Sequence, residues 1–145
     1  MEYNVIIVFD SNESHVLMCR RRKNPYRGML NFVGGKIEKD ENRLEAAYRE
    51  LQEETSISRI NINLRHIMDI AYILEDGFME VYVGRLNDDV PISGTENELL
   101  WVDINEDFSN TARFAGCGNI YHMLSYIKTY GAQINADEKV NLNLN

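Results

Sequence analysis

Cysteine, proline and long apolar runs are scarce in this chain of 145 residues. The two cysteines, Cys19 and Cys117, form neither a disulfide framework nor a paired metal-binding spacing. We therefore predict two buried thiols in a reducing, cytoplasmic protein. No apolar run approaches the roughly 20 residues of a membrane helix. The first four residues also lack the basic start of a secretion signal, so we expect neither a membrane partner nor export.

Positive charge is also in short supply. The chain has 15 Lys and Arg against 23 Asp and Glu, a formal net charge of −8, which argues against a nucleic-acid polymer as partner. Five of these basic residues fall within 20–27, and seven acidic residues fall within 38–54. Neighbouring basic and acidic clusters suit a phosphate substrate carried on a divalent metal. Two solvated surface faces are the alternative interpretation.

The hydrophobic pattern predicts strands and two helices in a single domain, residues 1–145, of the α/β class. We expect strands near residues 5–9, 15–20, 30–33, 64–74, 78–86 and 99–104. Asp40 or Glu41 is expected to cap the start of the first helix, and the core face of this helix is expected to hold Leu44, Ala47, Tyr48 and Leu51. The second helix, with Ile120, Met123, Leu124 and Ile127 on one face, is expected to end near Gly131. A polar tail follows at 135–145.

Three glutamates gather on the first predicted helix. At 100° per residue, Glu50, Glu53 and Glu54 share an arc of about 100° beside the apolar face. Such like-charged neighbours repel each other, unless a hard cation such as Mg²⁺ or Mn²⁺ bridges them. Gly34 and Gly35, just upstream, allow a backbone carbonyl to approach as a further oxygen ligand. A plain solvated face remains the alternative for the glutamates alone.

These residues resemble the Nudix box, written G-x5-E-x7-R-E-U-x-E-E-x-G-U with U a bulky aliphatic residue. The matching positions are Gly35, Glu41, Arg49, Glu50, Leu51, Glu53, Glu54 and Ile57, eight of the nine fixed ones. The exception is Ser56, where the family has Gly at the end of the helix. We expect this departure to cost about 1 kcal/mol or less of backbone energy and to touch no ligand.

The resemblance implies an α/β/α sandwich with a mixed β-sheet. The implied enzyme is a hydrolase of nucleoside diphosphates linked to another group, with Mg²⁺ or Mn²⁺ as cofactor. Carried over by position, the metal ligands would be Glu50, Glu53, Glu54 and the Gly35 carbonyl. Arg49 would orient them, Glu41 would be its structural partner, and Glu38 is an added acid near the metals. The general base would be a box glutamate or a loop glutamate, for which we favour Glu96 over Glu98.

Residues 30–38 are most similar to the MutT-type enzymes, which hydrolyse nucleoside triphosphates to the monophosphate and pyrophosphate. We therefore expect a small nucleotide substrate, with 8-oxo-dGTP as one example, and a monomer or homodimer. Asn31 and Asn119 are candidates for reading a purine edge, and Arg21 for contacting phosphate. The alternatives are a strand-end cap for Asn31, a helix cap for Asn119 and a solvated side chain for Arg21.

The alternatives for the whole protein are a hydrolase of ADP-ribose or a dinucleoside polyphosphate, or a nucleotide-binding module without turnover. The complete set of box glutamates argues against the binding module. Trp101 is expected in the core and not as a stacking platform. The three histidines, His15, His66 and His122, show no spacing that indicates metal ligation.

Overall fold

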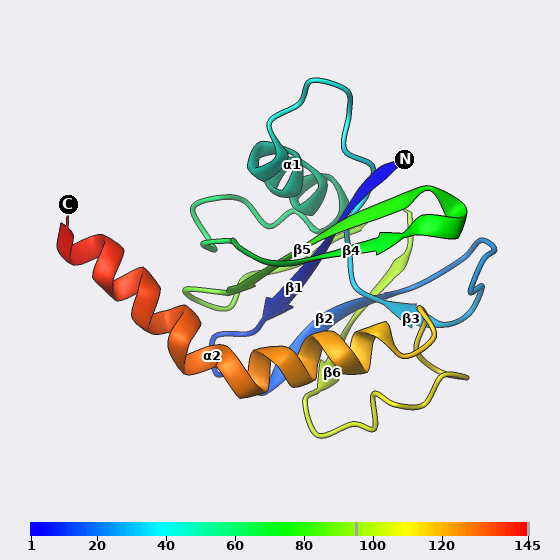
Figure 1. Cartoon of the computed structure of the whole chain (residues 1–145). Coiled ribbons are helices and arrows are strands. Elements are labelled where there is room, and N and C mark those ends of the chain that lie inside the picture. Colours follow the sequence, from blue (N-terminus) through cyan, green and yellow to red (C-terminus); the bar gives the residue numbers. More distant parts are fainter. Residues whose placement is uncertain (95, 145) are drawn as a thin grey trace. The chain divides into compact units, whose positions relative to one another are not determined.

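All six predicted strand regions contain strands in the computed structural model, which describes residues 1–94 and 96–144 (Figure 1). The strands are β1 (Glu2–Phe9), β2 (His15–Arg20), β3 (Leu30–Asn31), β4 (Arg65–Tyr72), β5 (Gly77–Arg85) and β6 (Glu98–Asp103). All of them belong to one compact unit, Met1–Glu106. A second unit, Asp107–Asn145, carries the long helix α2 (Asn119–Leu144).

β1 lies inside the sheet because its apolar run suits a strand covered on both faces. It pairs with β5 in parallel, from Glu2 opposite Phe78 to Phe9 opposite Arg85, and with β2 in antiparallel. The strand order is β3-β2-β1-β5-β4, and β6 pairs with β2. A short 3-10 helix, Ile73–Glu75, joins β4 to β5. The mixed sheet and the α/β class are therefore confirmed.

Helix α1 (Arg43–Thr55) begins one or two residues later than predicted. Its N-cap is Asn42, whose Oδ1 accepts a hydrogen bond from the Glu45 N–H at 3.0 Å. Asp40 cannot take this role, because it has a left-handed φ of 63° while an N-cap needs extended backbone. Glu41 is occupied elsewhere, since its carboxylate binds Arg49.

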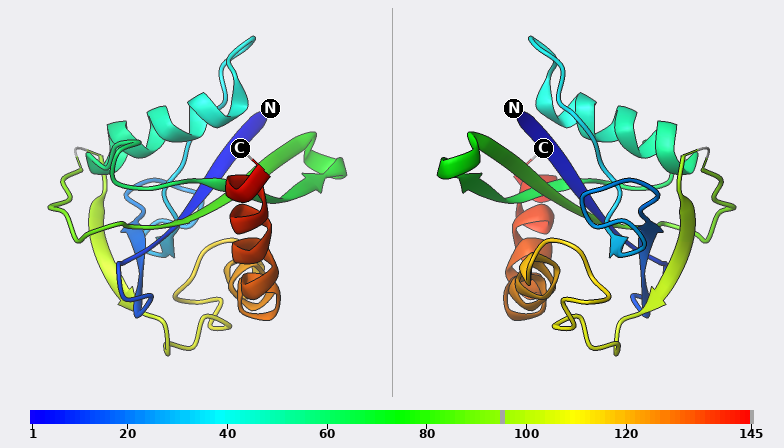
Figure 2. Two further views of the ribbon diagram at one scale, coloured as in Figure 1. Left: turned by 90° about the vertical axis from the view of Figure 1, so that its left-hand side faces the viewer. Right: turned by 90° about the vertical axis from the view of Figure 1, so that its right-hand side faces the viewer.

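α1 packs on one face of the sheet, as Figure 2 shows from two sides. Ala47, Tyr48 and Leu51 are buried as predicted and join the core cluster with residues of β1 and β2. The prediction for Leu44 is wrong, because this side chain is 40% exposed. Ala46 is fully buried near the start of the helix instead, where its small side chain fits against the protein. A prediction from large apolar residues at helical spacing does not detect a small buried residue such as Ala46.

The Ser56 departure from the Nudix box is accommodated at the end of α1. Ser56 has a left-handed φ of 68°, and its N–H donates to the Gln52 carbonyl at 3.0 Å, which closes the helix. The family glycine adopts this conformation without a steric penalty. Here the Ser56 hydroxyl lies 2.8 Å from the Ser93 hydroxyl, and this contact with the next loop partly offsets the cost.

Two predictions about the second unit are wrong. α2 does not end near Gly131 but runs through to Leu144, across the predicted polar tail. A glycine inside a helix costs only about 1 kcal/mol relative to Ala, and the good helix formers Ala132 and Gln133 follow it. Cys117 is exposed in a turn with φ 53°, whereas Cys19 in the first unit is buried as predicted. In the described part of the chain, no helix has the length and apolar character needed to cross a membrane.

Candidate active site

The two glycines before α1 lie in a space too narrow for any side chain. A Cβ on Gly34 would come within 2.2 Å of the Asn4 carbonyl oxygen on β1. A Cβ on Gly35 would come within 2.3 Å of the Glu50 carboxylate on α1. The Gly34–Gly35 backbone is therefore held between the central strand and the acidic helix, which only glycine allows.

Asn4 fixes this backbone from the strand side. Its N–H donates to the Gly35 carbonyl at 2.8 Å, and its side-chain Oδ1 accepts from the Gly35 N–H at 2.9 Å. Asn4 is only 2% exposed, and its Nδ2 has no hydrogen-bond partner among the described residues. We did not predict Asn4 from the sequence. The available signal is a polar residue in an otherwise apolar buried strand, a position where burial is costly without hydrogen bonds.

Glu54 reaches the same backbone from the helix side. Its Oε2 accepts a hydrogen bond from the Gly34 N–H at 3.1 Å. The pKa of Glu54 is raised to about 7, chiefly by burial and also by the negative charges of Glu50, Glu96 and Glu53, while the hydrogen bond from the Gly34 N–H opposes the shift. A bound cation would favour the ionised form of this carboxylate.

Arg49 connects the other acidic residues of the box. Its Nε and Nη2 donate to both oxygens of Glu41, at 2.6 Å and 2.9 Å, and hold the pKa of Glu41 below its usual range. Its Nη1 donates to Glu50 at 3.0 Å and to Glu53 at 3.2 Å. The structure thus brings Arg49 to three of the carboxylates that the sequence placed around it. Burial raises the pKa of Glu50, and the bond from Arg49 acts in the opposite direction.

Glu96 faces Glu54 across a small cavity of about 10 Å³, enough for about one water molecule. Cys19, Asn97 and Leu99 complete its lining. Burial, followed by the charge of Glu54, raises the pKa of the Cys19 thiol to about 11, so this cysteine stays protonated. Glu98 is not part of this lining and forms an ion pair with Arg20 at 3.2 Å. The structure therefore brings Glu96 to Glu54 of the box, while Glu98 has a different partner.

The three predicted substrate residues lie in different places. Asn31 on β3 is the register partner of Cys19, and its Oδ1 accepts from the Phe32 N–H at 2.9 Å. Arg21 donates from Nε to the Pro25 carbonyl at 2.7 Å. This hydrogen bond stabilises the basic loop, which follows β2 and contains Arg21, Arg22, Lys23 and Arg27. Asn119 is the first residue of α2, in the second unit. Trp101 on β6 is partly buried against the core cluster, in agreement with a packing role.

The metal ligands expected from the resemblance fit a hard divalent cation. Glu50, Glu53, Glu54 and the Gly35 carbonyl offer oxygen only, and Mg²⁺ and Mn²⁺ prefer oxygen ligands. The carboxylate of Glu50 lies directly against the Cα of Gly35, in the space where any other residue would carry its Cβ. This arrangement suits an ion shared between the helix and the glycine backbone.

Comparison with known proteins assigns the chain to a family. The model of the NUDIX domain family matches residues 2–113. No curated protein sequence matches the chain. Solved structures with the same fold include one from a comparison of the MutT proteins of the fish pathogen Aliivibrio salmonicida and of Vibrio cholerae. Its identity to this chain is 24% and its TM-score is 0.56, and the alignment covers 71% of this chain and 79% of that one.

Two longer alignments show the same fold. The Ap4A hydrolase of C. elegans has 16% identity and a TM-score of 0.68, covering 92% of this chain and 98% of that one. A bifunctional NMN adenylyltransferase/ADP ribose pyrophosphatase of Francisella tularensis, complexed with AMP and a Mn ion, has 18% identity and a TM-score of 0.69. That alignment covers 88% of this chain and 41% of that one. With the family match over most of its length, the chain belongs to the NUDIX domain family and is a Nudix hydrolase.

Proposed function

We propose that this Nudix hydrolase cleaves a nucleoside triphosphate to the monophosphate and pyrophosphate, with Mg²⁺ or Mn²⁺ as cofactor. The observation that carries the proposal is the placement of Glu50 and Glu54 against the Gly34–Gly35 backbone, with Glu53 joined to Glu50 through Arg49. The basic loop that follows β2 supplies Arg21 and its neighbours for the phosphate chain. A neighbour with this fold has been solved in complex with AMP and a Mn ion, which supports a nucleotide and a divalent metal as ligands of this chain.

The residues of the site have separate tasks in this reaction. A divalent ion held by the glutamates and Gly35 would neutralise phosphate charge and lower the pKa of a water. Glu96 accepts the proton of the attacking water, since it lines a water-sized cavity with Glu54. The water oxygen forms a new bond to phosphorus as the bridging phosphoanhydride bond breaks and pyrophosphate leaves. Arg49 keeps Glu50 and Glu53 in position through its two short contacts.

The choice of a triphosphate rests on the similarity of residues 30–38 to MutT-type enzymes. An oxidised purine such as 8-oxo-dGTP is the substrate we favour, with the amides of Asn31 and Asn119 reading the base edge. Neighbours with this fold are described as acting on Ap4A or ADP ribose, so both compounds are the competing substrates. We place the enzyme in the cytosol, because its two cysteines are thiols and not a disulfide.

The test is pyrophosphate and phosphate release with Mg²⁺ across a panel: dGTP, 8-oxo-dGTP, the other triphosphates, ADP-ribose and diadenosine polyphosphates. We expect pyrophosphate from one triphosphate well above the rest, and its loss in Glu53→Gln. The matched control is Glu45→Gln, which changes an exposed glutamate of the same helix that pairs with Arg59. Turnover of ADP-ribose alone would replace the proposed substrate, and near-wild-type turnover in Glu53→Gln at limiting Mg²⁺ would overturn the ligand assignment.

A further inference from the structure

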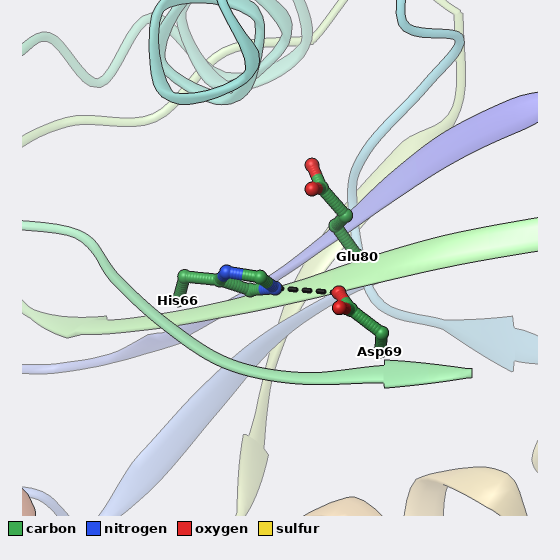
Figure 3. Close-up of side chains that lie close together, drawn as sticks. All are labelled: His66, Asp69 and Glu80. Atoms are coloured by element: carbon green, nitrogen blue, oxygen red, sulfur yellow. Dashed lines mark hydrogen bonds and ion pairs between the residues drawn. The ribbon is translucent and has the colours of Figure 1, made fainter.

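A second group of potential metal ligands lies on the sheet, outside the Nudix box. His66 and Asp69 come from β4 and point toward each other, with Nε2 and Oδ1 2.6 Å apart, and Glu80 comes from the neighbouring strand β5 (Figure 3). Ligand atoms of all three residues lie within 4.8 Å of one another. We propose that His66, Asp69 and Glu80 form a binding site for a divalent transition-metal ion of the zinc type.

A β-bulge creates this group. In a regular strand, residues three apart point to opposite faces. The register of β4 against β5 shifts between His66 and Met68, so that His66 faces Tyr82 while Asp69 faces Glu80. The extra residue turns His66 and Asp69 to the same face, and bulges commonly redirect side chains in this way. The spacing of the histidines in the sequence therefore gave no indication of metal ligation. The bulge and the cross-strand register determine which side chains come together, and neither can be read from that spacing.

Glu80 and His66 are held in place by a shell of further contacts. Glu80 is only 5% exposed, and its Oε2 accepts from the Tyr82 hydroxyl at 3.2 Å. Burial raises the pKa of Tyr82 to about 12, so its hydroxyl remains a donor. The His66 ring stacks on the Tyr82 ring with centroids 5.1 Å apart. Metal-binding carboxylates usually have hydrogen bonds of the kind that Tyr82 gives Glu80, which fix their orientation.

The local charge also favours a cation. Arg43 is 3.3 Å from Glu80 and 2.8 Å from Glu2, so one guanidinium is shared between two carboxylates. With Asp69 the group holds three carboxylates against this single arginine. Asn4 on β1 is the register partner of Glu80 on β5. The buried Nδ2 of Asn4 has no hydrogen-bond partner among the described residues. An oxygen bound beside Glu80, such as a water that completes the coordination of a metal, would give this donor an acceptor.

The donor types select the metal. One imidazole nitrogen and two carboxylate oxygens are ligands that Zn²⁺ accepts, and three protein ligands leave one position for water. The Nudix box offers oxygen only and suits Mg²⁺ or Mn²⁺. The site uses no residue of the box, so it stands independently of the proposed reaction. A metal there would link β4, the edge strand of the β3-β2-β1-β5-β4 path, to β5 and stabilise that edge of the sheet.

The experiment is a calorimetric titration of the metal-free full chain with Zn²⁺ in excess Mg²⁺, which is added to compete for the box glutamates. Visible spectra with Co²⁺ report the ligand type. The variants are His66→Ala and Asp69→Asn, whose side chains are about 40% exposed, so folding should survive. The matched control is His122→Ala, an exposed histidine of the second unit.

We expect the wild type and His122→Ala to bind one Zn²⁺ and to gain thermal stability from it. His66→Ala and Asp69→Asn should bind at least tenfold more weakly and gain none, with Mg²⁺-dependent turnover unchanged. Equal Zn²⁺ affinity in all four proteins would overturn the site, as would the absence of Zn²⁺ binding to the wild type under these conditions.

Discussion

The Nudix-box glutamates and the His66 group differ in what holds them and in what they offer a metal. Glu50, Glu53 and Glu54 come from one helix, where Glu54 accepts from the Gly34 N–H and Glu50 lies against Gly35, so the set consists of oxygen alone. The His66 group comes from two strands, is held by side chains such as Tyr82, and includes a nitrogen. The comparison teaches that one small sheet-and-helix unit can present two donor sets suited to different metals.

The largest effect is expected from a substitution that disrupts the Nudix-box donor set and leaves the His66 group unchanged. Glu54→Gln removes the negative charge of a proposed metal ligand at almost unchanged volume. We expect it to lower turnover with Mg²⁺ by about 100-fold or more, because loss even of the outer contacts of a metal site costs 10–100-fold. The variant should retain the wild-type affinity for Zn²⁺ at His66. Steady-state kinetics and Zn²⁺ titration measure the two properties on the same preparation. Wild-type turnover in Glu54→Gln would contradict the division into two sets.

Asn4→Ala should produce the next largest effect. The substitution leaves the Gly35 N–H without the partner it now has at 2.9 Å, and an unsatisfied buried donor costs about 1–3 kcal/mol. Urea denaturation of the metal-free chain should show a free energy of unfolding lower by about this amount, with weaker Mg²⁺ binding. Asn12→Ala, at an exposed turn, is the control and should change the free energy of unfolding by about 0.5 kcal/mol or less. Equal stability of the two variants would show that Asn4 does not hold the glycine backbone.

A smaller effect concerns pH. The folded pKa of Glu54, about 7, lies above the ordinary glutamate value of about 4.5, so the native state holds this proton more tightly than the unfolded state does. The contribution to stability is fully present below about pH 4.5 and is lost as the pH rises through 7. Metal-free protein should therefore lose thermal stability from Glu54 across this range, and Glu54→Gln should flatten that part of the profile. Added Mg²⁺ should reverse the loss at neutral pH. A profile identical in wild type and variant would rule out the raised pKa.

The smallest effect is chemical and leaves the fold untouched. Cys117 is exposed, whereas Cys19 is buried with a pKa of about 11. Iodoacetamide should therefore modify Cys117 in the native protein and reach Cys19 only after denaturation. Peptide mass mapping distinguishes the two positions. Rapid native modification of Cys19 would show that the cavity beside Glu54 opens to reagents.

Much of the first unit was predictable because its signals are local. The strand runs and the Gly35-to-Glu54 spacing depend on residues close together in the chain. The N-cap was missed because the left-handed backbone of Asp40 is set by the loop and not by its residue type. The buried Ala46 and exposed Leu44 depend on how α1 meets the sheet. The His66 group depends on a bulge and on strand pairing, neither of which the spacing reveals.

The most direct test of the central claim is ³¹P NMR of a triphosphate, first 8-oxo-dGTP and then dGTP, incubated with the wild-type chain and Mg²⁺. The proposed reaction predicts equal amounts of nucleoside monophosphate and pyrophosphate, and neither product after metal removal. Formation of nucleoside diphosphate and orthophosphate would contradict the account, as would triphosphates that remain intact throughout.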